Sequence, residues 1–204
     1  MPTNRKLVVT ENMTVDGVID AAGDWFSPAG DTDVDLSDLE AALREQMAAQ
    51  DAILLGRITF EAFREYWPKQ IDDTTGVTAH LNSVQKYVIS STLRDPRWKN
   101  TRVLRGDPVA EARALKEQPG GEIGVTGSIS VVWKLIEAGL VDELRLFVYP
   151  TILGRGRRLL ESKPVQPTLQ LVDATPFRSG VVLLTYRATA PPRSTALNRM
   201  VASS

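Results

Sequence analysis

The sequence predicts one three-layer α/β domain whose mixed central sheet ends in an antiparallel hairpin. Two observations indicate this fold class. Short apolar runs alternate with helical patterns from residue 6 to residue 149, as in domains where helices cover both faces of a largely parallel sheet. Two segments of alternating polarity then flank a turn at Ser179–Gly180, which is typical of a β-hairpin. No internal repeat or domain linker interrupts the pattern.

Strands are expected where apolar or β-branched residues run together between turn residues. The expected strands are residues 6–10, 52–55, 86–89, 102–104, 123–126 and 142–149, followed by the hairpin strands 168–172 and 181–187. Gly56 and Gly127 directly follow two of these runs, and a helical pattern begins at once after each. These glycines therefore predict turns between a strand and a helix.

The first two long helices have recognisable ends. Ser37-Asp-Leu-Glu40 forms a capping-box pattern, in which Ser37 is the N-cap and Glu40 its partner, so a helix is expected to begin there. The second helix is expected over residues 57–66, because Trp67-Pro68 ends it.

Three further helices are expected in the second half of the pattern. Residues 79–84 form a short one. Asp107-Pro108 is an N-cap followed by proline at the first helical position, which predicts a helix to residue 116. Ser128 is expected to cap a helix that Gly139 ends.

Two segments have no regular pattern. Residues 11–35 are polar and contain Gly17, Gly23 and Gly30. A connection of this length is usually a binding lid or disordered, and Trp25 and Phe26 favour a lid that packs on the domain. Residues 190–204 show no periodicity. The expected organisation is therefore one domain over residues 1–189 and a flexible tail over 190–204.

Composition excludes several functional classes. The net charge of −1 gives no broad basic field, which argues against binding to nucleic acid or an anionic membrane. The chain has no cysteine, so disulfides, thiol nucleophiles and cysteine–metal sites are excluded, and no metal site is expected. No apolar run approaches the roughly 20 residues of a spanning helix. A cytoplasmic protein is the expectation.

The two glycine turns predict a phosphate site. A helix entered directly from a strand presents unpaired backbone N–H groups and the positive end of its dipole. Two such ends at one edge of a sheet would receive a ligand with two separated phosphates. Arg57 supports this, because a cation in a first helical turn opposes the macrodipole. The alternative is a solvated arginine paired with Glu61 at i,i+4.

The run Leu55-Gly-Arg-Ile-Thr-Phe-Glu61 resembles the Gly-Arg-x-Thr signature of dihydrofolate reductases. Residues 54–67, 86–93, 121–128 and 137–156 resemble more closely the dihydrofolate-reductase-like branch that contains the RibD C-terminal domain, the reductase domain of bifunctional riboflavin biosynthesis proteins. The resemblance covers about residues 6–187. It implies a dihydrofolate-reductase-like αβα fold and an oxidoreductase that uses NADPH.

The resemblance also implies positions for the cofactor. Gly56, Arg57 and Thr59 would hold its phosphates. Ser90 and Ser91, with the adjoining Thr92, would lie near the adenosine 2′-phosphate; the alternative is turn chemistry at the end of a strand. The pyrophosphate would be lined by Gly127, Ser128, Ile129 and Ser130.

Two acidic residues are candidates for the catalytic site. Thr14-Val-Asp-Gly17 resembles the Leu-Asp-Gly stretch that leaves the first strand in this branch, so Asp16 could face the substrate; the alternative is a turn aspartate. Counting back from the Gly-Arg signature places Glu40 where dihydrofolate reductases carry the acid that binds the pterin. Its alternative role is in the capping box.

The expected function is NADPH-dependent hydride transfer to a small heterocycle, pterin-like or aminopyrimidine-like, as in 5-amino-6-(5-phosphoribosylamino)uracil reductase. Two alternatives stay open: a non-catalytic nucleotide-binding or regulatory module, and a scaffold that dimerises through its sheet edge. A homodimer is expected because the riboflavin-pathway relatives look dimeric. The basic run at residues 154–158 could bind a phosphate or form a solvated turn.

Overall fold

The computed structural model describes residues 5–19, 25, 33–159 and 168–189. The predicted tail at 190–204 and Phe26 lie outside these residues. The described strands are β1 (Leu7–Thr14), β2 (Gln50–Gly56), β3 (Gln85–Ile89), β4 (Thr101–Leu104), β5 (Glu122–Val125), β6 (Glu143–Tyr149), β7 (Thr168–Pro176) and β8 (Val182–Thr189). The helices are α1 (Ser37–Ala49), α2 (Arg57–Tyr66), α3 (Val77–Ser83), α4 (Pro108–Lys116) and α5 (Ile129–Glu137), with a short 3₁₀ helix at Trp67–Lys69.

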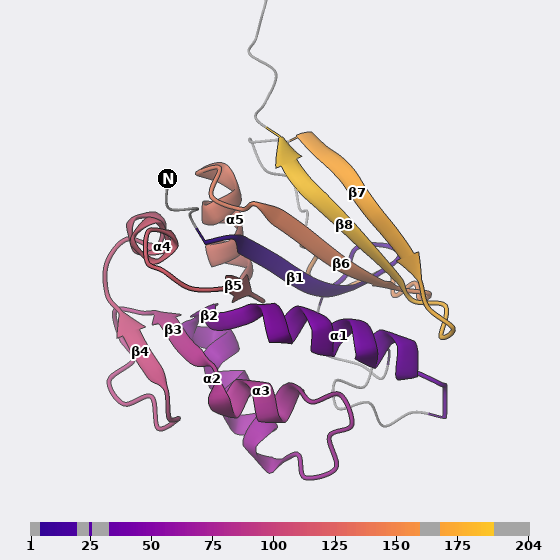
Figure 1. Ribbon diagram of the computed structural model, residues 1–204, viewed down its shortest axis with the longest axis horizontal. Coiled ribbons are helices and arrows are strands. Elements are labelled where there is room, and N and C mark those ends of the chain that lie inside the picture. Colours follow the sequence, from indigo (N-terminus) through magenta and orange to yellow (C-terminus); the bar gives the residue numbers. More distant parts are fainter. Residues whose placement is uncertain (1–4, 20–24, 26–32, 160–167, 190–204) are drawn as a thin grey trace, which may run out of the picture.

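The strands form one eight-stranded mixed sheet in the order β4-β3-β2-β5-β1-β6-β8-β7. The strands from β4 to β6 run parallel, and β8 and β7 are antiparallel to their neighbours. The predicted α/β class and the terminal hairpin are thus confirmed. Strand β1 lies in the middle of the sheet, between β5 and β6 (Figure 1).

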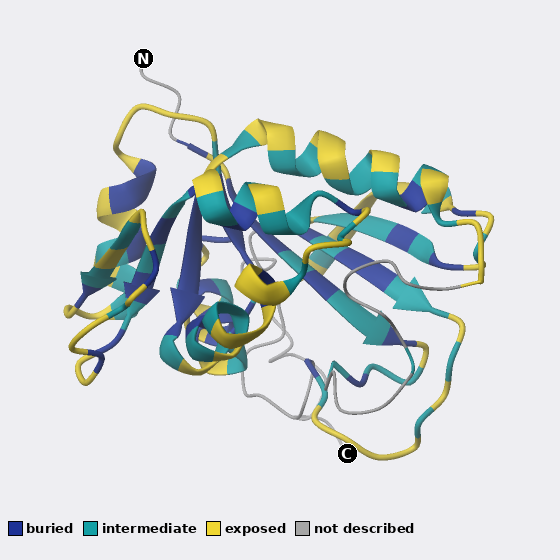
Figure 2. Cartoon of the chain, turned by 90° about the horizontal axis from the view of Figure 1, so that it is seen from below, coloured by how far each residue is buried: buried dark blue, intermediate teal, exposed yellow. Residues whose placement is uncertain are grey.

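Helices cover both faces of the sheet, and the buried residues of the strands lie between them (Figure 2). Helices α4 and α5 pack on the face that carries Leu54, Val125 and Leu146. Helix α2 packs on the opposite face, against Ile53 and Leu55. Helix α1 packs on this second face at β6 and β8, where it contributes Leu39. Neighbouring strand residues therefore enter different cores, as the two-residue period of a strand requires.

Strand β1 is longer than predicted. It continues through Glu11 and Asn12 to Thr14 and pairs with β6 up to Thr14↔Tyr149. The expected lid therefore begins later in the chain than residue 11. The sequence did not predict this extension, because a central strand usually consists of a continuous apolar run and Glu11 and Asn12 are polar.

The predicted capping box at the start of α1 is wrong. Leu36 occupies the N-cap position and makes no side-chain cap. Ser37 is the first helical residue, and its backbone N–H donates to Asp35 Oδ1 at 3.0 Å. Asp107, in contrast, caps α4 as predicted, because its carboxylate accepts from the N–H groups of Val109 and Ala110.

Among the described residues, no helix is long and apolar enough to cross a membrane.

Candidate functional site

The candidate site lies at the carboxyl ends of the central parallel strands. Pairing between β1 and β5 ends at Val9↔Val125. The connection from β1 leads through α1 on one face of the sheet to β2, and the connection from β5 leads through α5 on the other face to β6. Such a topological switch point leaves a crevice outside the strand ends, where open α/β sheets bind their ligands.

The two predicted glycine turns meet at this edge. The Gly56 N–H donates to the Gly127 carbonyl at 3.3 Å, and the hydroxyls of Thr59 and Ser128 lie 3.3 Å apart. The Gly127–Ser128 peptide is cis, and Gly127 has φ +85°. The structure thus brings together the residues that were predicted to hold phosphates on α2 and α5.

Both turns require glycine because they approach so closely. A Cβ on Gly56 would lie 2.3 Å from Ser128 Oγ, and a Cβ on Gly127 would lie 2.7 Å from Thr59 Oγ1. A side chain at either position would force the facing residue to shift.

The first turns of α2 and α5 receive no side-chain cap. Ser128 occupies the N-cap position of α5 as predicted, but it does not cap the helix; its hydroxyl faces Thr59 instead. The N–H groups of the first helical turns, which include Ile129 and Ser130, are therefore left for another acceptor. Two neighbouring helix ends of this kind attract anions.

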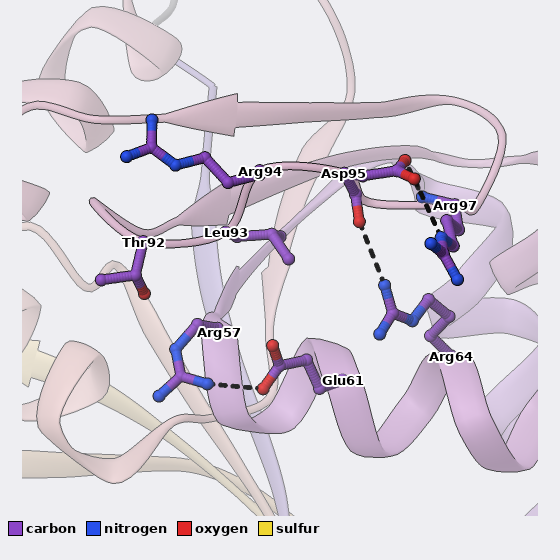
Figure 3. A pocket seen from close by; sticks show the side chains of 8 residues that line it. All are labelled: Arg57, Glu61, Arg64, Thr92, Leu93, Arg94, Asp95 and Arg97. Carbon is purple, nitrogen blue, oxygen red and sulfur yellow. Dashed lines mark hydrogen bonds and ion pairs between the residues drawn. The ribbon is translucent and has the colours of Figure 1, made fainter.

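A basic pocket of about 320 Å³ adjoins the start of α2. Helix α2 contributes one wall, and the loop after β3 contributes the other (Figure 3). The lining residues are Arg57, Glu61, Arg64, Thr92, Leu93, Arg94, Asp95 and Arg97. Four arginines face two acidic residues here, so the pocket favours an anionic ligand.

The arginines differ in their partners. Arg57 Nη1 donates to Glu61 Oε2 at 2.6 Å, which is the i,i+4 pair that was the alternative to phosphate binding. Arg64 binds the carbonyls of Asp95 and Pro96, and Arg97 pairs with the Asp95 carboxylate. Arg94, which is exposed, makes no ion pair or hydrogen bond with another described residue.

The three hydroxyl residues after β3 divide into different roles. Ser90 is buried, and its Oγ accepts from the backbone N–H groups of Thr92 and Leu93. Ser91 is exposed, and its carbonyl accepts from Arg105. Thr92 lines the basic pocket. The turn alternative thus describes the Ser90 hydroxyl, and of the three residues Thr92 is the one that lines the pocket.

Asp16 fastens the segment after β1 to the turn at 153–158. Its carboxylate accepts from the Thr14 hydroxyl at 2.6 Å and from the Leu153 and Gly154 N–H groups. Arg158 pairs with it at 3.4 Å. The hydrogen bonds to this carboxylate, led by that from Thr14, lower the pKa of Asp16 to about 2. Asp16 is therefore held ionised and cannot donate a proton near neutral pH. In the basic run at residues 154–158, Arg158 contacts Asp16.

Glu40 lies on α1 among other partners. Its two carboxylate oxygens accept from the Thr74 hydroxyl at 2.7 Å and from Arg44 Nη2 at 2.8 Å. The structure shows no contact between Glu40 and the two glycine turns. Its role toward a substrate stays a prediction, as do the roles assigned to Asp16 and to the cofactor-binding residues.

Sequence reasoning missed three residues of this region. Arg94 and Arg97 lie within five residues after Thr92, so two arginines in that loop were the available signal. Glu11 lies on β1 beside Gly127 and is buried; its position inside an unusually polar central strand was the signal. Among the described residues, no group of three or more His, Asp and Glu could hold a metal ion.

Within the predicted lid, the described residue Trp25 packs on the domain. The ring of Trp25 meets Tyr149 edge-on, with centroids 5.2 Å apart. Tyr149 is the last residue of β6, so this contact lies at the same end of the sheet as the glycine turns.

Comparison with known proteins supports one family. Residues 5–183 match the model of the RibD C-terminal domain. The uncharacterized protein YyaP of Bacillus subtilis is 30% identical over 185 residues, which span 89% of this chain and 94% of YyaP.

Solved structures share the fold. A putative riboflavin biosynthesis protein from Shewanella sp. PV-4 superposes with a TM-score of 0.69 at 17% identity, over 91% of this chain and 99% of that chain. A pyrimidine reductase-like protein from Corynebacterium diphtheriae superposes with a TM-score of 0.65 at 16% identity, over 92% of this chain and 93% of that chain.

Proposed function

Because this chain belongs to the RibD C-terminal domain family, we propose that it is an NADPH-dependent reductase that transfers a hydride to a small heterocycle, pterin-like or aminopyrimidine-like. The pyrimidine reductase-like protein among its structural neighbours supports the aminopyrimidine class. The observation that carries the proposal is the pair of neighbouring uncapped helix ends, with the basic pocket at the start of α2.

The residues present fit NADPH. The facing N–H groups of α2 and α5 match a pyrophosphate, which needs donors on two sides. The basic pocket lies next to them on α2 and offers Arg57 and Arg94 to a further phosphate. Guanidinium groups bind phosphate through paired, charge-assisted hydrogen bonds, so this pocket would favour NADPH over NADH.

When bound, the cofactor would supply the hydride, and the protein would supply position and electrostatics. The turns at Gly56 and Gly127 would fix the phosphate end. The segment that Asp16 ties down and the Trp25–Tyr149 contact would border the crevice and limit the access of water. A dry, preorganised crevice strengthens the interactions that orient the reactants.

Titration with nucleotide followed by a turnover assay tests the proposal. NADPH should bind more tightly than NADH in a calorimetric titration. Dihydronicotinamide absorbance should then fall when a panel of pterins and aminopyrimidines is added. Absence of heat with both nucleotides would contradict the proposal at its first step.

A non-catalytic nucleotide-binding module is the second candidate, and one observation favours it. Both predicted catalytic acids have protein partners, since Asp16 is held by backbone N–H groups and Glu40 by Arg44 and Thr74. A binding module would saturate with NADPH and show no turnover with any member of the panel.

We also propose a homodimer. Strand β7 forms an edge of the sheet and exposes Leu171 and Val172, and an exposed apolar edge strand invites pairing with a second chain. Light scattering should give twice the chain mass, and Leu171→Lys should return the monomer. Monomeric wild-type protein would refute this part alone.

A further inference from the structure

Glu11 is a buried acidic residue that the proposed chemistry leaves unused. It lies on β1 two residues beyond Val9, the last residue of β1 that pairs with β5. By the alternation of a strand, its side chain shares a face with Val9 and Met13, which pack in the core under α4 and α5. Glu11 therefore lies at the crevice, on the side from which α5 begins.

The Glu11 carboxyl has apolar neighbours, and one of its oxygens lacks a hydrogen-bond partner in the part of the chain that the structure describes. Leu146 is its neighbour on β6, and the inward face of α5 presents Val131 and Val132. Oε1 is buried and has no hydrogen-bond partner among the described residues. Burial raises the pKa of Glu11 to about 8, and the Gly127 backbone N–H lowers it by less.

No described charged group compensates Glu11. Around this end of the sheet, Asp16 pairs with Arg158 and Arg57 pairs with Glu61. Helix α5 carries Lys134 and Glu137, and both are exposed. The raised pKa of Glu11 thus follows from burial, because no described positive charge offsets it.

We propose that Glu11 couples nucleotide binding to proton uptake: a phosphate-bearing ligand binds at the start of α5 when the Glu11 carboxyl is neutral, and not when it is ionised. This inference rests on the proposed function. An ionised Glu11 would place a negative charge beside Gly127, in the turn that must accept the pyrophosphate. In a buried site such a charge is poorly screened and repels the ligand.

The direction of the pH dependence follows. Below about pH 8 the carboxyl is already neutral, so affinity should be nearly constant. Above that pH, each bound ligand must first recruit one proton, and affinity should fall by about tenfold per pH unit. Ligand binding should in turn raise the pKa of Glu11, because linkage is reciprocal.

The experiment measures NADPH affinity by calorimetry from about pH 7 to about pH 9.5 for three full-length proteins. Wild type should lose affinity above about pH 8. Glu11→Gln keeps the shape of a neutral carboxyl, so it should bind as wild type does near pH 7 and should not show the loss. Glu137→Gln, at the far end of α5, is the matched control and should follow wild type.

Comparison with Glu11→Gln also distinguishes the titration of Glu11 from that of Lys86. Lys86 is a buried lysine under α3 whose pKa is lowered to about 8 by burial, and it is present in both proteins. Equal pH profiles for wild type and Glu11→Gln would overturn the inference while leaving the proposed function intact. Absence of NADPH binding by wild type at every pH would overturn both.

A second measurement does not depend on a variant folding. Wild-type protein is titrated with NADPH about one pH unit above the pKa of Glu11 in two buffers of different ionisation enthalpy. The observed heats should differ by the amount expected for uptake of close to one proton per nucleotide. Identical heats in both buffers would overturn the inference.

Discussion

Arg94 is distinguished from the other arginines of the basic pocket by its lack of a described partner. Arg57 must leave Glu61, or share it, to bind a phosphate. Arg64 and Arg97 already bind the loop at 95–96. A charged ligand therefore gains most from Arg94, since no existing contact is lost.

Arg94→Ala should lower NADPH affinity by about tenfold, which is near the value of one charge-assisted hydrogen bond at a partly exposed site. NADH, which lacks the 2′-phosphate, should lose little. Calorimetry with both nucleotides gives the comparison. Arg102→Ala is the control, because this exposed arginine of β4 lies outside the pocket. Equal losses for NADPH and NADH would place Arg94 on the pyrophosphate instead.

Asp16→Asn should loosen the turn after β6. The variant keeps the size of the side chain but loses the charge that binds the Leu153 and Gly154 N–H groups and Arg158. Hydrogen exchange at the Leu153 and Gly154 amides should become faster, while exchange within β6 stays unchanged. Unaltered exchange at these two amides would show that Asp16 does not hold the turn.

The same contacts predict an acid dependence. The pKa of Asp16 is lowered to about 2 in the folded protein from 3.8, so its stabilising contribution is complete above about pH 3.8 and is lost as the pH falls through about 2. Protection of the two amides should follow this course in wild type and not in Asp16→Asn.

Residue roles of this kind were the part that the sequence predicted least well. Ser128 bonds to Thr59, and Asp16 bonds to Leu153 and Gly154, so their partners lie far away along the chain. A local pattern suggested a cap for Ser128 and another for Ser37, because serine at a helix start usually caps it. At Ser128 a tertiary partner decided the outcome, and at Ser37 the helix begins one residue earlier than the pattern indicated.

Helix α2 shows what the sequence predicts well at the scale of elements. Its bounds, Arg57–Tyr66, are those expected from the preceding glycine and from Trp67-Pro68, and these signals are local. Strand β1 shows the limit. Its length is fixed by pairing with β6, which continues through polar residues to Thr14, and pairing between distant segments leaves no local mark.

The contact between the two glycine turns gives a prediction for α2 and α5. Gly56→Ala should destabilise the protein by about 1–3 kcal/mol, the usual cost of an overpacked site, since the new Cβ would lie 2.3 Å from Ser128 Oγ. Adding Ser128→Gly removes that hydroxyl and should recover part of the loss. Chemical denaturation of the single and double variants measures the coupling.

Gly106→Ala is the matched control for this cycle, because its Cβ would meet only the flexible Glu111 side chain. Strictly additive effects of Gly56→Ala and Ser128→Gly would mean that the turns do not touch in solution.

At the scale of the whole molecule, the crevice lies where the turns before α2 and α5 meet. A ligand bound there would contact elements on both faces of the sheet and should stabilise the entire domain. NADPH at about 100 times its dissociation constant should add about 2.7 kcal/mol. For a chain of this size that corresponds to a rise of about 5 to 10 °C in Tm. Thermal denaturation with and without NADPH measures it. An unchanged Tm at saturating NADPH would contradict a site between the two halves.

The central position of β1 has a consequence for how the protein is made. Among the described strands β1 leaves the ribosome first, yet both of its neighbours, β5 and β6, come later in the chain, at Glu122–Val125 and Glu143–Tyr149. Pairing between such distant segments is slow, because a long loop must close first. Nascent chains that end before β6 should therefore remain open to protease, and resistance should arise only when Tyr149 has emerged from the exit tunnel.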